Sequence, residues 1–203
     1  RSTILLALLA TIIGSTVGAL IGLISAYFGG RIDEIIMRIV DAVMAIPGLL
    51  FALLIISALG SSAINAVIAI GITFAPGMAR VSRSITLTVR EQDYVAAAVA
   101  RGEGAAWIIL REIAPNILAP VIVESTIRVA FAIMLLATLS FLGMGAQPPS
   151  PEWGLMISDA RAHLYRSPWP VIAPGVAIAT VAVAFNLLGD GLRDVLNPRV
   201  QGG

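Results

Sequence analysis

Long apolar stretches dominate the chain, and short charged segments separate them. The longest stretch without a charged residue covers residues 42–79, and another covers residues 2–30. A run of about 20 apolar residues forms a helix long enough to cross the roughly 30 Å hydrocarbon core of a bilayer. The pattern predicts an all-α polytopic membrane protein, a bundle of about five transmembrane helices. We place these helices at residues 4–27, 42–59, 63–79, 113–144 and 168–188.

Proline, glycine and serine divide the apolar stretches further. Residues 31–41 mix isoleucines with charged side chains at helical spacing, which predicts an amphipathic segment at the membrane interface. Pro47 should kink the helix that follows. The Gly-Ser-Ser sequence at 60–62 should separate two spans, and the second of these should continue to about Arg90.

Glycine recurs at every fourth position of the first span. Gly14, Gly18 and Gly22 share one helical face, and small residues at this spacing allow another helix to approach closely. Glycine is also frequent in membrane helices in general. In either case this face serves packing and not chemistry.

Composition excludes several classes of function. Hydrophobic residues make up 58% and charged residues 12% of the 203 residues, which is too apolar for a water-soluble domain. Without cysteine, and with His163 as its one histidine, the chain lacks the ligands of thiolate and multi-histidine metal sites. All 13 basic residues are arginine, so the lysine of a P-loop is missing, and a net charge of +1 gives no argument for nucleic acid. We expect no catalytic, cofactor or metal site.

The arginines predict the orientation of the chain in the membrane. Cytoplasmic loops carry an excess of basic residues, and nine arginines fall on one predicted side against three on the other. The segment 91–106 is then cytoplasmic, and the loop 145–167, with a short amphipathic helix, is extracytoplasmic. Arg1 lies outside, so we expect one more span before it. The nine are Arg31, Arg38, Arg80, Arg83, Arg90, Arg101, Arg111, Arg193 and Arg199, and the three are Arg1, Arg161 and Arg166.

The cytoplasmic segment 91–106 has the pattern of a short helix. Asp93 is suited to capping its start, alanines follow, and Gly102 is suited to ending it. The alanine-rich surface is small and smooth, so it can dock into a groove on another protein. The alternative is a solvated helix that only links two spans.

Sequence motifs in and around this segment resemble a known family. The pattern YVxAAxxxG at 94–102, followed by IAPN at 113–116, is similar to the EAA signature of ABC-importer permeases. EQDYV at 91–95 and REIAPNILAP at 111–120 resemble the dipeptide/oligopeptide/nickel permease family in particular. Ala96 stands where this family usually has glutamate. Stretches similar to its C-type subunit follow the same order: AYFGG at 26–30, LSFLGMG at 139–145, PEWG at 151–154 and FNLLGDGLRD at 185–194.

The resemblance implies an architecture and a set of partners. Residues 1–203 would form a single permease domain of the type I ABC-importer architecture, with a cytoplasmic coupling helix, in a bacterial inner membrane. The partners would be a second permease subunit, two cytoplasmic ATPase subunits that bind the ATP, an extracytoplasmic binding protein and membrane lipid. The chain would not be an enzyme and would hold no cofactor. It would import dipeptides or oligopeptides, with a nickel chelate as the alternative.

The same resemblance implies the site residues. The helix at 93–102 would contact the ATPase, and Gly102 and Pro115 would bracket a hinge. The expected ATPase contacts are Asp93, Tyr94, Ala97, Ala98, Arg101, Gly102 and Glu103.

The remaining polar residues leave alternatives open. Glu124 and Arg128 lie four apart within a span, so they can pair with each other. They line the translocation path, or they form a structural pair near a subunit interface. Asp41, near Arg38, is expected to be a solvated charge at the membrane boundary, and His163 is expected to be polar surface.

Two other classes of protein compete with an importer permease. An ion-coupled transporter or channel would need carboxylates in several spans or an inverted repeat, and Glu124 is the one carboxylate we place inside a span. An intramembrane enzyme would need a constellation of catalytic side chains within the spans, which a single histidine in an outer loop does not supply.

Overall fold

The computed structural model describes residues 1–196, and the regular secondary structure of this part consists of helices, without strands. This confirms the predicted all-α class. Four helices are long and apolar enough to cross a membrane, and a bent pair of helices gives a fifth span. Arg199, one of the arginines used for the orientation, lies outside the described residues. The helices are α1 (Ser2–Phe28), α2 (Gly30–Met44), α3 (Gly48–Leu59), α4 (Ala63–Arg90), α5 (Asp93–Ala100), α6 (Ala105–Trp107), α7 (Ala114–Phe141), α8 (Trp153–Ala160) and α9 (Trp169–Leu196).

The helices α1 and α4 pack with their backbones in close contact. A Cβ atom added to Gly18 would lie 2.3 Å from the carbonyl oxygen of Ala75, and one added to Gly22 would lie 2.2 Å from that of Ala79. The hydroxyl of Ser82 on α4 donates a hydrogen bond of 2.8 Å to the carbonyl of Ala19 on α1. The glycine face predicted from the sequence therefore serves helix packing.

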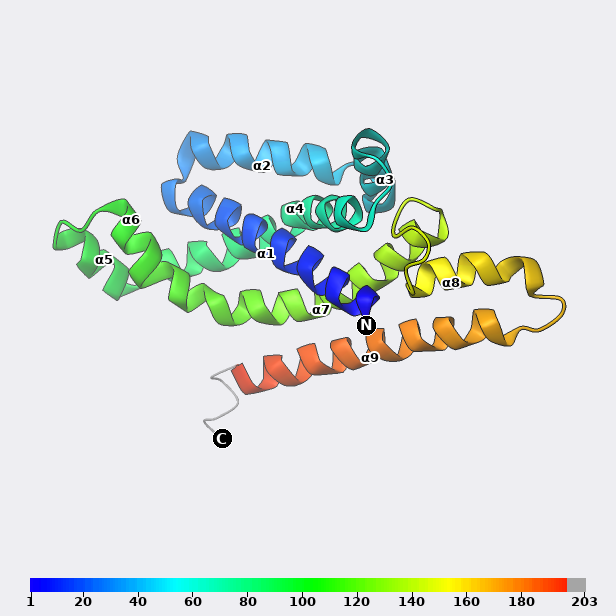
Figure 1. Cartoon of the computed structure of the whole chain (residues 1–203). Coiled ribbons are helices and arrows are strands. Elements are labelled where there is room, and N and C mark those ends of the chain that lie inside the picture. Colours follow the sequence, from blue (N-terminus) through cyan, green and yellow to red (C-terminus); the bar gives the residue numbers. More distant parts are fainter. Residues whose placement is uncertain (197–203) are drawn as a thin grey trace.

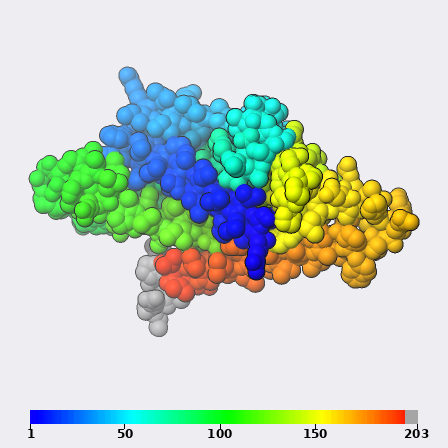
Figure 2. Space-filling model, in the orientation of Figure 1, coloured from blue at the N-terminus to red at the C-terminus, as the bar shows by residue number. Residues whose placement is uncertain are grey.

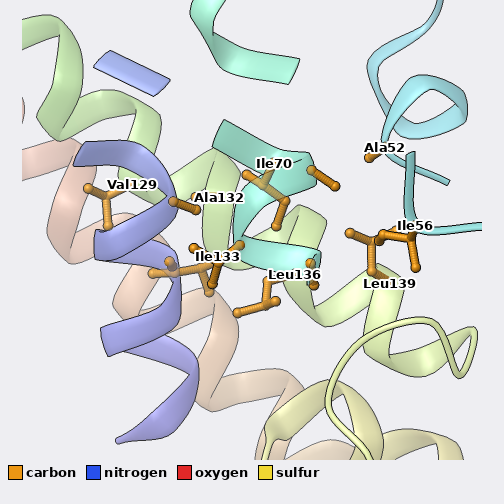
Figure 3. Close-up of a cluster of buried hydrophobic side chains, with 13 residues drawn as sticks. Ala52, Ile56, Ile70, Val129, Ala132, Ile133, Leu136 and Leu139 are labelled. Atoms are coloured by element: carbon orange, nitrogen blue, oxygen red, sulfur yellow. The ribbon is translucent and has the colours of Figure 1, made fainter. Parts of the chain in front are cut away.

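The apolar core lies where α1, α3, α4 and α7 meet. Ile70 of α4 lies beside Ile133 and Leu136 of α7, and Ile56 of α3 reaches Leu139 (Figure 3). These side chains are fully buried. The peripheral helix α9 is the least buried of the long helices and runs along the outside of the bundle (Figure 1).

The second predicted span differs from the structure. Instead of one kinked helix over 42–59, α2 ends at Met44 and α3 begins at Gly48, and their axes meet at 90°. Pro47 causes the break because it has no N–H to donate and its ring excludes a continuous helix. At 1.5 Å per residue the 12 residues of α3 extend only about 18 Å, so α3 does not cross the bilayer without α2.

The fourth predicted span starts earlier than residue 113. Residues 105–141 form one helical rod of 37 residues, in which α6 and α7 are joined by a π-helical segment, Ile108–Ile113. Arg111 and Glu112 are accommodated because they lie near its end, outside the apolar part. Pro115 falls in the first turn of α7, directly after the π segment, where the wider helix removes the clash a proline ring makes with a regular turn.

The two polar segments lie at opposite ends of the bundle. Figure 1 shows α5 and α6 at one end and the loop before α8 at the other. The space-filling view shows the same separation, with the green α5 and α6 region at the left and the yellow and orange α8 region at the right (Figure 2). Segments 91–106 and 145–167, predicted to face opposite sides of the membrane, thus lie at opposite ends of the bundle.

The α1–α4 contact makes a matched pair of substitutions informative. Gly18→Ala should destabilise the fold by about 1–3 kcal/mol, because the new methyl group meets backbone and the helices must separate. Gly175→Ala in α9, where nothing lies within 4 Å of the new methyl group, should be neutral or slightly stabilising. Thermal unfolding of the purified protein in detergent measures both. Equal unfolding temperatures for the two variants would contradict the packing role.

Candidate functional site

The short helix α5 is held against one end of the bundle of spans. Two of its side chains, Val95 at 2% and Ala98 at 0% exposure, are buried. They pack with Leu23 of α1 and with Ile113 and nearby isoleucines of the π-helical segment and α7. The buried side of α5 therefore packs against the ends of two spans.

The described part of the chain leaves the opposite face of α5 exposed. Tyr94 is 39% exposed and Ala97 is exposed as well. Ala98, which the sequence places among the residues that contact a partner, is fully buried. It positions α5 and does not contribute to the free face.

The ends of α5 agree only in part with the sequence. Asp93 is the first residue of the helix and not its cap; Gln92 occupies the cap position without a side-chain hydrogen bond. The Asp93 carboxylate still suits the first turn, where the helix dipole favours negative charge. Gly102 follows the helix with φ +81°, a conformation that favours glycine, so the predicted stop is confirmed.

Arg101 ties the end of α5 to the rod that follows. Its guanidinium lies 3.5 Å from Glu112 and 3.8 Å from Glu103, and it stacks 5.9 Å from the ring centre of Trp107. These contacts are half-exposed, so each one contributes little to stability. Together they fix the turn at Gly102 relative to the π-helical segment.

Tyr94 has an altered acidity in this setting. Burial, with the carboxylate of Glu112 as the second cause, raises the pKa of the Tyr94 phenol above its ordinary value of 10.0. This shift favours the neutral phenol, whose O–H is a hydrogen-bond donor.

Glu124 and Arg128 form the predicted pair within α7. Arg128 donates a hydrogen bond of 2.9 Å to Glu124, and its guanidinium lies over Gly77 of α4, whose missing side chain leaves room for it. A hollow of about 430 Å³ beside Glu124 is lined by α4, α7 and α9, and Arg193 lies at its margin. Glu124 thus lines a mostly apolar hollow between spans, and Arg128 packs against α4.

Asp41 is exposed, as predicted, and also makes an ion pair that the sequence did not predict. It accepts a hydrogen bond of 2.6 Å from Arg80 of α4, while Arg38 pairs with Glu34. A second ion pair joins Asp33 of α2 to Arg83 of α4. The sequence reasoning missed these bonds between α2 and α4 because the partners are 39 and 50 positions apart.

Glu152, at the opposite end, was also missed. This carboxyl group is fully buried and accepts a 2.5 Å hydrogen bond from the Ser140 hydroxyl, while its other oxygen has no partner. Gly145 and Gly154 let the loop approach α7 closely, since added Cβ atoms would lie 2.0 Å from the Ser140 hydroxyl and 2.2 Å from the Ala137 carbonyl. Burial raises the pKa of Glu152 above its ordinary value of 4.5.

Within the described residues, no group of three or more histidine or acidic side chains could hold a metal ion. His163 lies exposed in the short 3₁₀ turn after α8. The notable features of this chain are therefore the free face of α5 at one end and the polar groups between α2, α4 and α7.

Comparisons with known proteins agree with this geometry. The family model described as "Binding-protein-dependent transport system inner membrane component" matches residues 18–202. The dipeptide transport system permease protein DppC of Alkalihalophilus pseudofirmus is 45% identical over 91% of this chain and 60% of its own length. DppC of Haemophilus influenzae is 40% identical over 99% of this chain and 68% of its own length.

Two further similarities extend the comparison. The glutathione transport system permease protein GsiD of Escherichia coli is 41% identical over 95% of this chain and 64% of its own length. The chain thus spans about 60–68% of the length of these relatives. A structure of the MetNI methionine ABC transporter in inward-facing conformations matches the fold with a TM-score of 0.77 at 16% identity, over 97% of this chain and 93% of that one.

The buried carboxyl of Glu152 predicts a pH dependence of stability. Because its pKa is raised in the folded protein, the folded state favours the protonated carboxyl. The resulting stabilisation is present below pH 4.5 and is lost as the pH rises through the raised pKa. The unfolding temperature in detergent should therefore fall between pH 5 and pH 8 by more in the wild type than in Glu152→Gln. Asp159→Asn, at an exposed carboxylate of α8, should keep the wild-type slope; parallel slopes for all three proteins would contradict the prediction.

Proposed function

Because the chain belongs to the family of binding-protein-dependent transport system inner membrane components, we propose that it is a permease subunit of an ATP-driven importer. It forms half of a translocation path across the inner membrane. The observation that carries this function is the free face of α5, held by Val95 and Ala98 on two spans. The family match favours a permease over the two alternatives, an ion-coupled transporter and an intramembrane enzyme.

The proposed solute is a dipeptide or oligopeptide. Support comes from relatives named for dipeptide and glutathione transport, which share 40–45% identity with this chain. A nickel chelate is the second candidate, on the resemblance of the motifs at 91–95 and 111–120.

A partner ATPase supplies the energy in this proposal. The chain has no lysine and so no P-loop of its own; ATP is bound by two cytoplasmic ATPase subunits. The free face of α5 docks on one of these two subunits. The proposed contacts are Asp93, Tyr94, Ala97, Arg101, Gly102 and Glu103.

The coupling between ATPase and spans is mechanical. Closure of the two ATPase subunits displaces α5, and the buried contact of Val95 and Ala98 carries the displacement to α1 and α7. Gly102 permits the turn to change, and the π-helical segment before Pro115 provides the adjustable part of the rod. The ATP-bound ATPase subunits favour one orientation of the spans because they bind that orientation more tightly than the other.

The other partners bind at the remaining surfaces. A second permease subunit completes the path, and lipid covers the apolar faces of α1 and α9. An extracytoplasmic binding protein delivers solute to the end that carries the loop 145–167, where Asp159, Arg161 and Arg166 offer charged contacts. Glu124 and Arg128 lie beside the path, next to the hollow between α4 and α7.

Two alanine substitutions at opposite ends of the molecule test the docking face. Ala97→Trp places a large ring on the free face of α5 and should reduce both the co-purifying ATPase and solute uptake about tenfold, a loss of about 1.4 kcal/mol of binding. Ala162→Trp, also at an exposed alanine but beside α8, should retain the ATPase. Pull-down of the complex through a tag on this chain measures the association. Full ATPase recovery with Ala97→Trp would overturn the assignment.

A further inference from the structure

The cytoplasmic half of α4 leaves a polar face uncovered. Its residues recur every three or four positions, which places them on one side of the helix. Arg80, Ser84 and Thr88 are exposed, and Thr73 and Gly77 are partly covered. We call this set the polar track: Thr73, Gly77, Arg80, Ser84 and Thr88.

Other long helices expose a different kind of face. The uncovered residues of α1 include Leu5, Leu9 and Val17, and those of α9 include Val183 and Leu187. Such apolar faces suit contact with lipid tails. The hydroxyls of Thr73 and Thr88 donate hydrogen bonds to carbonyl groups of their own helix, so the guanidinium of Arg80 is the group on this face that disfavours contact with lipid.

The break between α2 and α3 lies against the outer end of the polar track. A Cβ atom added to Gly48 would lie 3.2 Å from the Thr73 methyl group, and a hollow of about 140 Å³ at the break is lined by Thr73 and Pro76. Thr73 and Pro76 are central in the 28-residue α4, so the break lies deep in the membrane.

The backbone at this break is incompletely hydrogen-bonded, although the exposed side chains around it, such as Met44, Ile46 and Leu50, are apolar. The first N–H groups of α3, beginning at Gly48, have no partner within their own helix, and Pro47 interrupts the helical hydrogen bonds. Residues 44–50 are exposed on the surface of this chain. Irregular backbone at membrane depth is tolerated only where protein buries it or where it lines a water-filled cavity.

The ion pair of Asp41 and Arg80 gives an independent indication. Its side chains are 57% and 50% exposed. Arg80, counted above with the arginines of the cytoplasmic side, directly follows the uncharged stretch 42–79 and lies ten residues, or about 15 Å along the helix, before the end of α4 at Arg90. Charged side chains at such depth face a bundle interior or water. The pair borders both the polar track and the break.

We infer that the polar track and the α2–α3 break line the water-filled part of the translocation path. This inference rests on the proposed importer function and names the surface along which the solute moves. Arg80 is matched by Asp41, and Arg128, which lies over Gly77, is matched by Glu124. The lining thus carries hydrogen-bonding groups without net charge, which suits a zwitterionic or neutral polar solute.

Accessibility of introduced cysteines tests the inference, because the chain contains no cysteine. Ser84→Cys on the track and Ala45→Cys at the break are compared with Val183→Cys, a control at a position 57% exposed on the apolar face of α9. The assembled importer in inverted membrane vesicles is treated with the charged thiol reagent 2-(trimethylammonio)ethyl methanethiosulfonate. Modification of this chain is followed by mass spectrometry.

Both test positions should react at least about tenfold faster than the control, since a thiol surrounded by lipid stays protonated and unreactive. Ser84→Cys changes a single atom, so its folding is retained. Rates equal to that of Val183→Cys would overturn the inference, because the face would then be covered by lipid or by the second permease. Recovery of the ATPase from the same vesicles separates this outcome from a failure of the proposed function.

Discussion

The contact between α1 and α4 places two backbones so close that no side chain fits between them. Gly18 and Gly22 face the carbonyl groups of Ala75 and Ala79 directly. In a membrane, where lipid tails are as apolar as leucine, such van der Waals packing takes the place of the hydrophobic effect as the force between helices. The other elements are positioned on this pair: α2 through its ion pairs to α4, and α7 through the core that it shares with both.

The short helix α5 depends on the packed spans for its structure. A helix of eight residues is too short to be stable by itself, and its structure depends on burying Val95 and Ala98 against the spans. In the proposed mechanism, a force on its free face acts on α1 and on the 105–141 rod together. The π-helical segment lies in that rod, directly before Pro115. In the proposed mechanism, this segment is where the rod changes its conformation.

The uncovered surfaces of the bundle divide into two kinds. The faces of α1 and α9 are apolar and fit lipid, whereas α4 presents hydroxyl groups, a glycine and an ion pair beside broken backbone. Exposing such groups to lipid is unfavourable, so we expect water or another protein to contact them. The polarity of uncovered faces thus separates the proposed path from the lipid boundary.

Sequence by itself determined the class, the existence of most spans, the glycine packing face and the short helix at its turn glycine. These features follow from local rules: the length of apolar runs, the spacing of small residues, and the backbone freedom of Gly102. Family motifs spread over residues 26–194 carried the functional hypothesis.

Tertiary structure alone decided the 90° bend between α2 and α3, the early start of the rod at Ala105 and the burial of Ala98. It also revealed the Arg80–Asp41 pair and the buried Glu152. Each of these depends on which surfaces meet in space, and their partners are up to tens of positions apart along the chain. The sequence shows that Pro47 interrupts a helix. The direction of α3, which follows this break, is set by its packing against α4.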